Sequence, residues 1–226
     1  MIALVPRCLH FTLLLALLSS ASACRPSRDP VGPSGRVVRP TRAEVSPLLW
    51  RPSLTGVAVL ARPARVDARR FAAVAAVGVY RHYSFQLAVL SPHRPAADQR
   101  RWRVESALVL ATAQRPFSGR QRPAAWLEAG DLDDDGHPEL AVAVSYANAA
   151  GERQAEVAVL NAAAGAPLSV ALQRAIAAPP ARPDWSAIVV RDRDLDGDGH
   201  PDIKLELGAK SATYIWDAGS DRYRPR

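Results

Sequence analysis

Apolar and polar residues alternate along short segments of the chain, and this pattern predicts β-strands. Over residues 203–207, one isoleucine and two leucines alternate with Lys204 and Glu206, which is the two-residue period of a strand with one buried face. The segment "ELAVAVSY" (139–146) is a short apolar run bounded by turn-type residues, as strands usually are. The pattern therefore predicts an all-β domain.

Three longer segments are each predicted to form two strands joined by a turn, and two of them have glycine in the turn. They are residues 85–110, 155–172 and 211–224. Within them, the sequences "LAVLS", "VAVLN" and "TYIWD" align as one repeated strand that ends in a polar residue. We therefore expect about three related units of short antiparallel, blade-like sheets, arranged as an incomplete propeller. The units cover about residues 66–115, 122–178 and 184–226.

The alanine-rich segment 68–80 fits two kinds of structure. It is compatible with strands, but its alanines would also suit a helix. Periodicity alone does not separate a buried helix from a buried strand in so short a run. We favour a pair of strands here and keep the helix as the alternative.

Two acidic segments share one layout in which carboxylates recur at alternate positions. The segments are "DLDDDGHPEL" (131–140) and "DLDGDGHPDI" (194–203). Counted from the first aspartate, carboxylates stand at positions 1, 3, 5 and 9, and glycine stands at position 6. The carboxylates belong to Asp131, Asp133, Asp135 and Glu139 in the first segment, and to Asp194, Asp196, Asp198 and Asp202 in the second.

This layout predicts a cation site in each loop. Odd positions of a tight loop can face one centre, because Gly136 and Gly199 permit the left-handed conformation that closes the turn. Four carboxylates around one point repel each other unless a cation lies between them. Hard oxygen ligands suit Ca²⁺, and they suit Mg²⁺ less because Mg²⁺ requires a stricter octahedron. We therefore predict two calcium sites, in loops 131–139 and 194–202.

The flanks of these loops distinguish them from EF-hands. An EF-hand requires helices on both sides and a glutamate at position 12, whereas position 12 is Val142 in the first loop and Leu205 in the second. The order of strand, D-x-D-x-D-G-x-x-[DE] and strand instead resembles the FG-GAP and VCBS-type repeats of integrin-like β-propellers. The resemblance covers residues 124–226 well and residues 66–115 only faintly.

The resemblance implies a ligand set for each loop. Ca²⁺ would be held by the side chains at positions 1, 3, 5 and 9 and by the backbone carbonyl at position 7, which belongs to His137 or His200. Neither imidazole is expected to bind zinc, because a lone histidine beside aspartates, with no cysteine nearby, lacks the usual tetrahedral set. We expect both rings to point outward.

Residues 1–23 have the features of an export signal peptide. Arg7 supplies a positive charge, and the apolar core 11–20 is too short to span a bilayer comfortably. Ala21 and Ala23 fit the small-residue rule of ordinary signal peptidase, which would release a secreted protein. The chain is therefore expected to be exported.

The cysteine that follows the signal suggests a lipid anchor. Cys24 would be the only cysteine left after cleavage, and a lone cysteine at the first mature position resembles a bacterial lipobox, whose thiol is lipidated. The resemblance implies a lipoprotein of the periplasm or outer membrane, and Arg25, in place of an aspartate, favours the outer membrane. Residues 24–53 are rich in Pro and Arg without an apolar period, so we expect a linker there. The β-repeat domain would cover residues 54–226.

The charge distribution and the absence of catalytic motifs restrict the functions that this protein could have. Basic residues dominate the first half of the mature chain and acidic residues the second. A basic half would attract anionic lipid headgroups or envelope polyanions. Nucleic acid is a poor partner for an exported protein whose arginines are not interleaved with aromatics. The sequence contains no G-x-S-x-G or H-E-x-x-H motif, so we predict no catalytic residues.

We therefore expect a non-catalytic, calcium-binding exported lipoprotein. Its β-repeat domain would bind an envelope protein or a surface glycan, and Ca²⁺ would stabilise that domain. Two alternatives stay open at this point. One is a periplasmic inhibitor or chaperone-like binder of another protein, and the other is a calcium-dependent hydrolase.

Overall fold

The computed structural model describes residues 37–226 apart from 52–53, 55, 80–81, 94–100, 115–122, 148–149, 151, 178–188 and 208–209. The predicted signal peptide and Cys24 lie outside the described residues. The elements, in chain order, are α1 (Arg42–Leu49), β1 (Gly56–Val59), β2 (Ala64–Arg65), β3 (Phe71–Val79), β4 (His82–Pro92), β5 (Trp102–Gln114), β6 (Ala124–Gly130), β7 (Glu139–Ala147), β8 (Arg153–Asn161), β9 (Ser169–Ala177), β10 (Val189–Arg191), β11 (Ile203–Leu207), β12 (Lys210–Asp217) and β13 (Arg222–Pro225).

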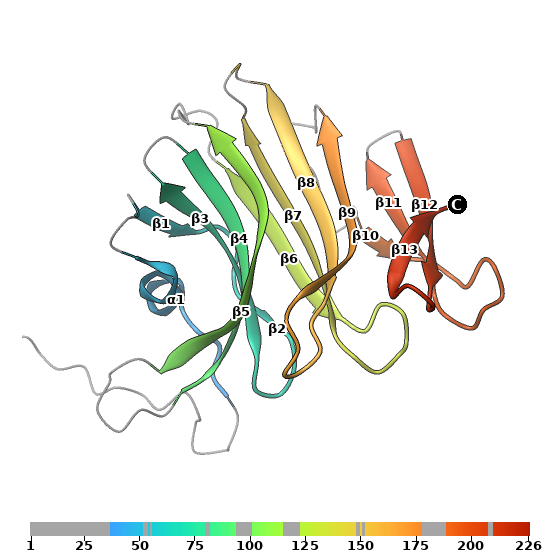
Figure 1. Cartoon of the computed structure of the whole chain (residues 1–226), viewed down its shortest axis with the longest axis horizontal. Coiled ribbons are helices and arrows are strands. Elements are labelled where there is room, and N and C mark those ends of the chain that lie inside the picture. Colours follow the sequence, from blue (N-terminus) through green and yellow to red (C-terminus); the bar gives the residue numbers. More distant parts are fainter. Residues whose placement is uncertain are drawn as a thin grey trace, which may run out of the picture.

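The strands form three antiparallel sheets, which confirms the predicted all-β fold (Figure 1). Sheet I has the order β1-β3-β4-β5, with β2 also paired to β3. Sheet II is β6-β7-β8-β9 and sheet III is β10-β11-β12-β13. None of these sheets closes into a barrel over the described strands. No helix among the described residues has the length and apolarity needed to cross a membrane.

The three sheets pack face to face through two apolar cores. Val74 and Leu87 of sheet I share one core with Leu140 and Leu160 of sheet II. The opposite face of sheet II contributes Val157, among other residues, to a second core that it shares with sheet III. Sheet II is therefore covered on both faces, and the apolar side chains of each sheet are buried by the next sheet along the chain.

Strand β3 explains why the alanine-rich segment was ambiguous. Alternate residues of β3 face sheet II and helix α1, so both faces of the strand are covered. Ala72, Ala73, Val74 and Ala75 are each fully buried, at 0% exposure. A strand buried on both faces has no polar alternation, and small side chains let two layers approach it closely. The segment is a strand, as favoured over a helix, but the predicted pair of strands is wrong, because Phe71–Val79 forms one continuous strand that pairs with β1, β2 and β4.

The predicted hairpins and the repeated strand are also present. Hairpins β4–β5, β8–β9 and β12–β13 are paired antiparallel. The aligned sequences "LAVLS", "VAVLN" and "TYIWD" lie in β4, β8 and β12, each of which is third in the order of its sheet. The sequence similarity therefore corresponds to one structural position repeated in three sheets.

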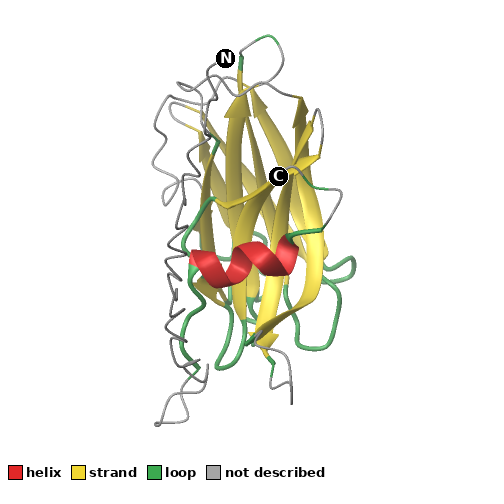
Figure 2. Ribbon diagram, turned by 90° about the vertical axis from the view of Figure 1, so that its left-hand side faces the viewer, coloured by secondary structure: helices red, strands yellow, loops and turns green. Residues whose placement is uncertain are grey.

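Helix α1 departs from the expected linker over residues 24–53. Thr41 caps the helix: its hydroxyl accepts a hydrogen bond from the Glu44 backbone N–H, and the Glu44 carboxylate accepts one from the Thr41 backbone N–H. Val45 and Leu49, four residues apart, bury one face of the helix against the outer face of sheet I. Figure 2 shows the helix lying across the strands. Residues 42–49 are thus part of the fold, because the capping box and two apolar side chains suffice for a short helix on an apolar sheet.

We predict that Thr41→Ala lowers the free energy of unfolding by about 1 kcal/mol, because it removes the cap of α1. Urea denaturation followed by circular dichroism measures this. The control is Ser46→Ala, whose hydroxyl donates to the Arg42 carbonyl within the same helix, and we expect a change within about 0.5 kcal/mol. Equal effects of the two changes would contradict a stabilising role for the capping box.

Candidate metal centre

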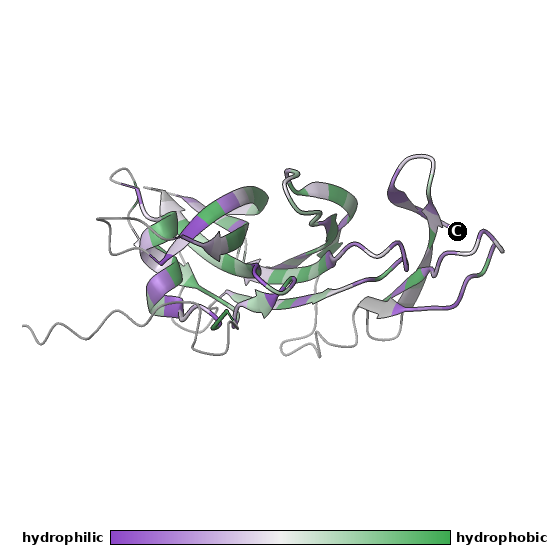
Figure 3. Cartoon of the chain, turned by 90° about the horizontal axis from the view of Figure 1, so that it is seen from below, coloured by the Kyte–Doolittle hydropathy of each residue, from purple (hydrophilic) through white to green (hydrophobic). Residues whose placement is uncertain are grey.

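The two acidic loops occupy equivalent places in neighbouring sheets. The first joins β6 to β7 and the second joins β10 to β11. Both project from the lower end of the stack in Figure 1, and Figure 3 shows them as hydrophilic segments beside apolar strands. The repeated sequence thus corresponds to a repeated position in the fold.

Each loop gathers three carboxylates around one point. Oxygens of Asp131, Asp133 and Glu139 lie within 4.8 Å of one another, and oxygens of Asp194, Asp196 and Asp202 do the same. These are positions 1, 3 and 9 of the predicted set. The structure therefore brings together three of the four predicted carboxylates in each loop, and either group could hold a metal ion.

The carboxylates at position 5 lie outside both groups. Asp135 accepts a hydrogen bond from the backbone N–H of His137 at 2.6 Å, and Asp198 accepts one from His200 at 2.8 Å. Each of these side chains therefore braces the backbone of its own loop. The backbone carbonyls of the two histidines remain predicted ligands.

Backbone N–H groups and left-handed residues shape the loops. The Asp131 carboxylate accepts from Gly136 N–H at 3.1 Å, and the Asp194 carboxylate accepts from Gly199 N–H at 2.9 Å. Gly136 and Gly199 have φ of +85° and +94°, as predicted for the residue that closes the turn. Position 4 is left-handed as well, at Asp134 (φ +61°) and Gly197 (φ +81°), a feature that sequence analysis missed although glycine occupies the second copy.

The carboxylates at position 9 tie each loop to the sheet behind it. Glu139, the first residue of β7, accepts a hydrogen bond from Leu132 N–H at 2.6 Å. Asp202 accepts from Leu195 N–H and from Trp216 N–H, both at 2.9 Å. Because Trp216 belongs to β12, the second loop is joined to two strands of sheet III.

Burial makes the first group electrostatically costly without a cation. Asp133 and Glu139 are each only 1% exposed. Burial, together with the charges of Asp133, Asp135 and Asp131, raises the pKa of Glu139 to about 8, and burial is also the main cause that raises the pKa of Asp133. No ion pair among the described residues involves a carboxylate of either group. A bound cation would supply the missing positive charge, so the donor set fits a metal ion.

Ionisation of the second group of carboxylates is less unfavourable than that of the first. Asp194 and Asp196 are exposed, and hydrogen bonds from the backbone N–H groups of Gly199 and Gly197 lower the pKa of Asp194. Only Asp202, at 0% exposure, is deeply buried. The two sites thus share a layout but differ in how strongly the protein itself opposes ionisation.

Tyr223 adds an observation that sequence analysis did not provide. Its side chain is 4% exposed, and its hydroxyl has no hydrogen-bond partner within the described part of the chain. Burial raises the pKa of Tyr223, and the charges of Asp133, Glu139 and Asp202 raise it further. This unpaired hydroxyl therefore lies close enough to carboxylates of both loops for their charges to affect its pKa.

The loops also contact each other directly. The His200 ring nitrogen Nδ1 lies 2.9 Å from the carbonyl oxygen of Asp133, and this contact raises the pKa of His200. Arg191, the last residue of β10, forms an ion pair with Asp134 in the first loop. His137 is exposed as predicted, but the prediction that both rings point outward is wrong for His200, because its ring reaches the neighbouring sheet.

The sequence matches no protein-family model, and no curated protein matches it.

We predict that metal-free protein loses stability as pH rises from about 5 to 8. The pKa of Glu139 is about 8 in the folded state against an ordinary 4.5, so between these values the folded chain binds more protons than the unfolded chain, and the free energy of unfolding falls with pH. Urea denaturation in chelator at both pH values measures the fall. Glu139→Gln should flatten the dependence, whereas Glu128→Gln, on the exposed part of β6, should retain it.

We predict that His200→Ala lowers the free energy of unfolding by about 1 kcal/mol, the usual contribution of one hydrogen bond. His137→Ala is the matched control, since His137 has the same loop position, is exposed and contacts no other loop among the described residues. We expect this change to alter the free energy of unfolding by no more than about 0.5 kcal/mol. Differential scanning fluorimetry and urea titration serve for both. If the two variants behave alike, the contact between the loops contributes nothing to stability.

Proposed function

We propose that this protein is a non-catalytic, calcium-stabilised binding protein of the cell envelope. In this proposal each acidic loop holds one Ca²⁺ ion, and the ions brace sheets II and III against each other. The observation that supports it is the pair of carboxylate groups at equivalent loop positions, each with a buried acid at position 9 and no ion-pair partner among the described residues.

The donor chemistry favours calcium over other metals. Every side-chain donor in the two groups is a carboxylate oxygen, and Ca²⁺ accepts six to eight oxygen ligands in a flexible geometry. Structural zinc sites are built from cysteine and histidine ligands, and neither group contains one. The His200 ring is engaged with the Asp133 carbonyl instead. Under this proposal the backbone carbonyls of His137 and His200 and the water shell complete the coordination, in line with the resemblance to FG-GAP and VCBS-type repeats.

Calcium would act through stability rather than chemistry. An ion that binds only the folded chain stabilises it by about 2.7 kcal/mol per site at a concentration one hundred times its Kd. In the first loop the ion would also remove the repulsion that raises the pKa of Glu139. The millimolar calcium outside cells would then select the folded domain after export.

The cellular placement in this proposal rests on residues 1–24 alone. Export by the signal peptide, and lipidation of Cys24 or release as a secreted protein, remain predictions from the sequence. A protein or glycan partner would meet the sheets, because in this proposal the loop carboxylates are committed to metal and offer no free acid or base for catalysis.

We predict two Ca²⁺ ions per chain and a rise in melting temperature of roughly 5–10 °C per site when millimolar Ca²⁺ replaces chelator. Elemental analysis after gel filtration and scanning calorimetry measure these. Asp133→Ala and Asp196→Ala should each lose one ion, and the double variant both.

Glu206→Ala is the control for these variants. Its carboxylate pairs with Lys204 on β11 and is outside both groups, so calcium content should be unchanged. A folded wild-type sample that binds no calcium at millimolar concentration would exclude the proposed role of the loops.

A further inference from the structure

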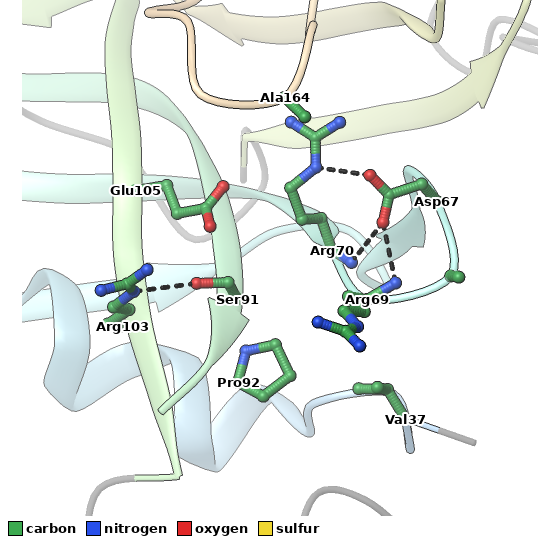
Figure 4. A pocket seen from close by; sticks show the side chains of 10 residues that line it. Val37, Asp67, Arg69, Arg70, Ser91, Pro92, Arg103, Glu105 and Ala164 are labelled. Carbon is green, nitrogen blue, oxygen red and sulfur yellow. Dashed lines mark hydrogen bonds and ion pairs between the residues drawn. The ribbon is translucent and has the colours of Figure 1, made fainter. Parts of the chain in front are cut away.

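A pocket of about 760 Å³ lies where one end of sheet I meets the β8–β9 turn of sheet II (Figure 4). Its walls come from the β2–β3 turn, the end of β4, the start of β5 and the β8–β9 turn. The polar residues that line it are Asp67, Arg69, Arg70, Ser91, Arg103 and Glu105. The lining shares no residue with the acidic loops, so the pocket has no part in the proposed calcium sites.

Arg70 is a buried cation with unused donors. The side chain is only 7% exposed, and its Nε donates to the Asp67 carboxylate at 2.5 Å. Asp67 also accepts from the backbone N–H groups of Arg69 and Arg70, at 2.7 and 2.8 Å. Both Asp67 oxygens are therefore occupied. The two terminal nitrogens of Arg70 have no acceptor within the described residues, and Figure 4 shows them directed toward Ala164, on the pocket wall.

Two further guanidinium groups line the same space. Arg103 donates from Nε to the Ser91 hydroxyl at 3.1 Å, which orients its side chain. Arg69 lies on the β2–β3 turn between Arg70 and Pro92 in the view of Figure 4. These three arginines face only two acids in the lining, and one of those acids, Asp67, is already satisfied.

The surroundings add positive charge. Arg65 donates to the backbone carbonyls of Asp67 and Ala68, which belong to the pocket-lining turn. Close by, burial and the charges of Arg62 and Arg65 lower the pKa of Arg39, which indicates crowding of cations at this end of sheet I. A group of one sign around a concave surface attracts ligands of the opposite sign.

We propose that this pocket binds a small ligand with one carboxylate or phosphate group on a hydroxyl-bearing body, as in an acidic sugar. Guanidinium forks pair with either anion through two parallel hydrogen bonds, and the volume is that of a typical small-molecule site. Val37, Pro92 and Ala164 offer apolar surface to the body of the ligand. Glu105 accepts a ligand hydroxyl and repels a second negative charge.

Isothermal titration of the full chain at low salt tests this proposal with three probes. They are galacturonate (a carboxylate sugar), glucose 1-phosphate (a phosphate sugar) and neutral galactose. We expect binding of one or both anionic sugars and none of galactose. The stronger of the two identifies which anion the site takes. The proposal is wrong if the Kd of both anionic sugars exceeds about 5 mM, because binding that weak approaches non-specific contact. It is also wrong if galactose binds as tightly as the anionic sugars.

A charge-matched pair of variants separates the pocket from general attraction. Arg69→Gln with Arg103→Gln should weaken binding of the anionic sugar at least tenfold. Arg222→Gln with Arg224→Gln, on β13 of sheet III, removes the same charge far from the pocket and should leave binding unchanged. Arg70 is left in place because its buried ion pair supports the fold. Equal losses in the two double variants would overturn the assignment of the site.

Discussion

Burial of both faces of a sheet is the constraint on which this structure depends. An isolated sheet exposes both of its faces to water, and here the apolar faces of neighbouring sheets are buried against each other. Sheet II is enclosed by sheets I and III, and the outer face of sheet I is closed by helix α1. Because each layer is stabilised by its neighbours, the order of layers follows the order of the chain.

This stacking places two acidic loops side by side at a junction between layers. The carboxylates at position 9 stand at the foot of β7 and β11 and are among the most buried polar groups in the described chain. Buried acids of this kind are unfavourable unless they are protonated or neutralised. The contacts of His200 and Arg191 with the first loop join the two sheets at the same place. The stability of the junction between sheets II and III therefore depends on the charge state of the loops.

Opposite charges gather at different places in the molecule. Carboxylates concentrate between sheets II and III, whereas arginines surround the pocket of sheet I. The separation keeps the two groups from neutralising each other, so each retains a strong local field. A junction whose carboxylates could hold a cation and a pocket lined by arginines can therefore coexist on one small scaffold.

The sequence alone determined the features that depend on local spacing. Strand alternation, the hairpins and the glycine that closes each acidic loop follow from residues within ten positions of one another, where backbone sterics and side-chain burial act directly. Only the tertiary structure decided which groups meet across longer separations. His200 and Asp133 are 67 residues apart, and the charges of carboxylates in both loops raise the pKa of Tyr223. His137 and His200 each stand between glycine and proline in the sequence, but their surroundings differ, because the His200 ring contacts the loop of the neighbouring sheet whereas His137 is exposed.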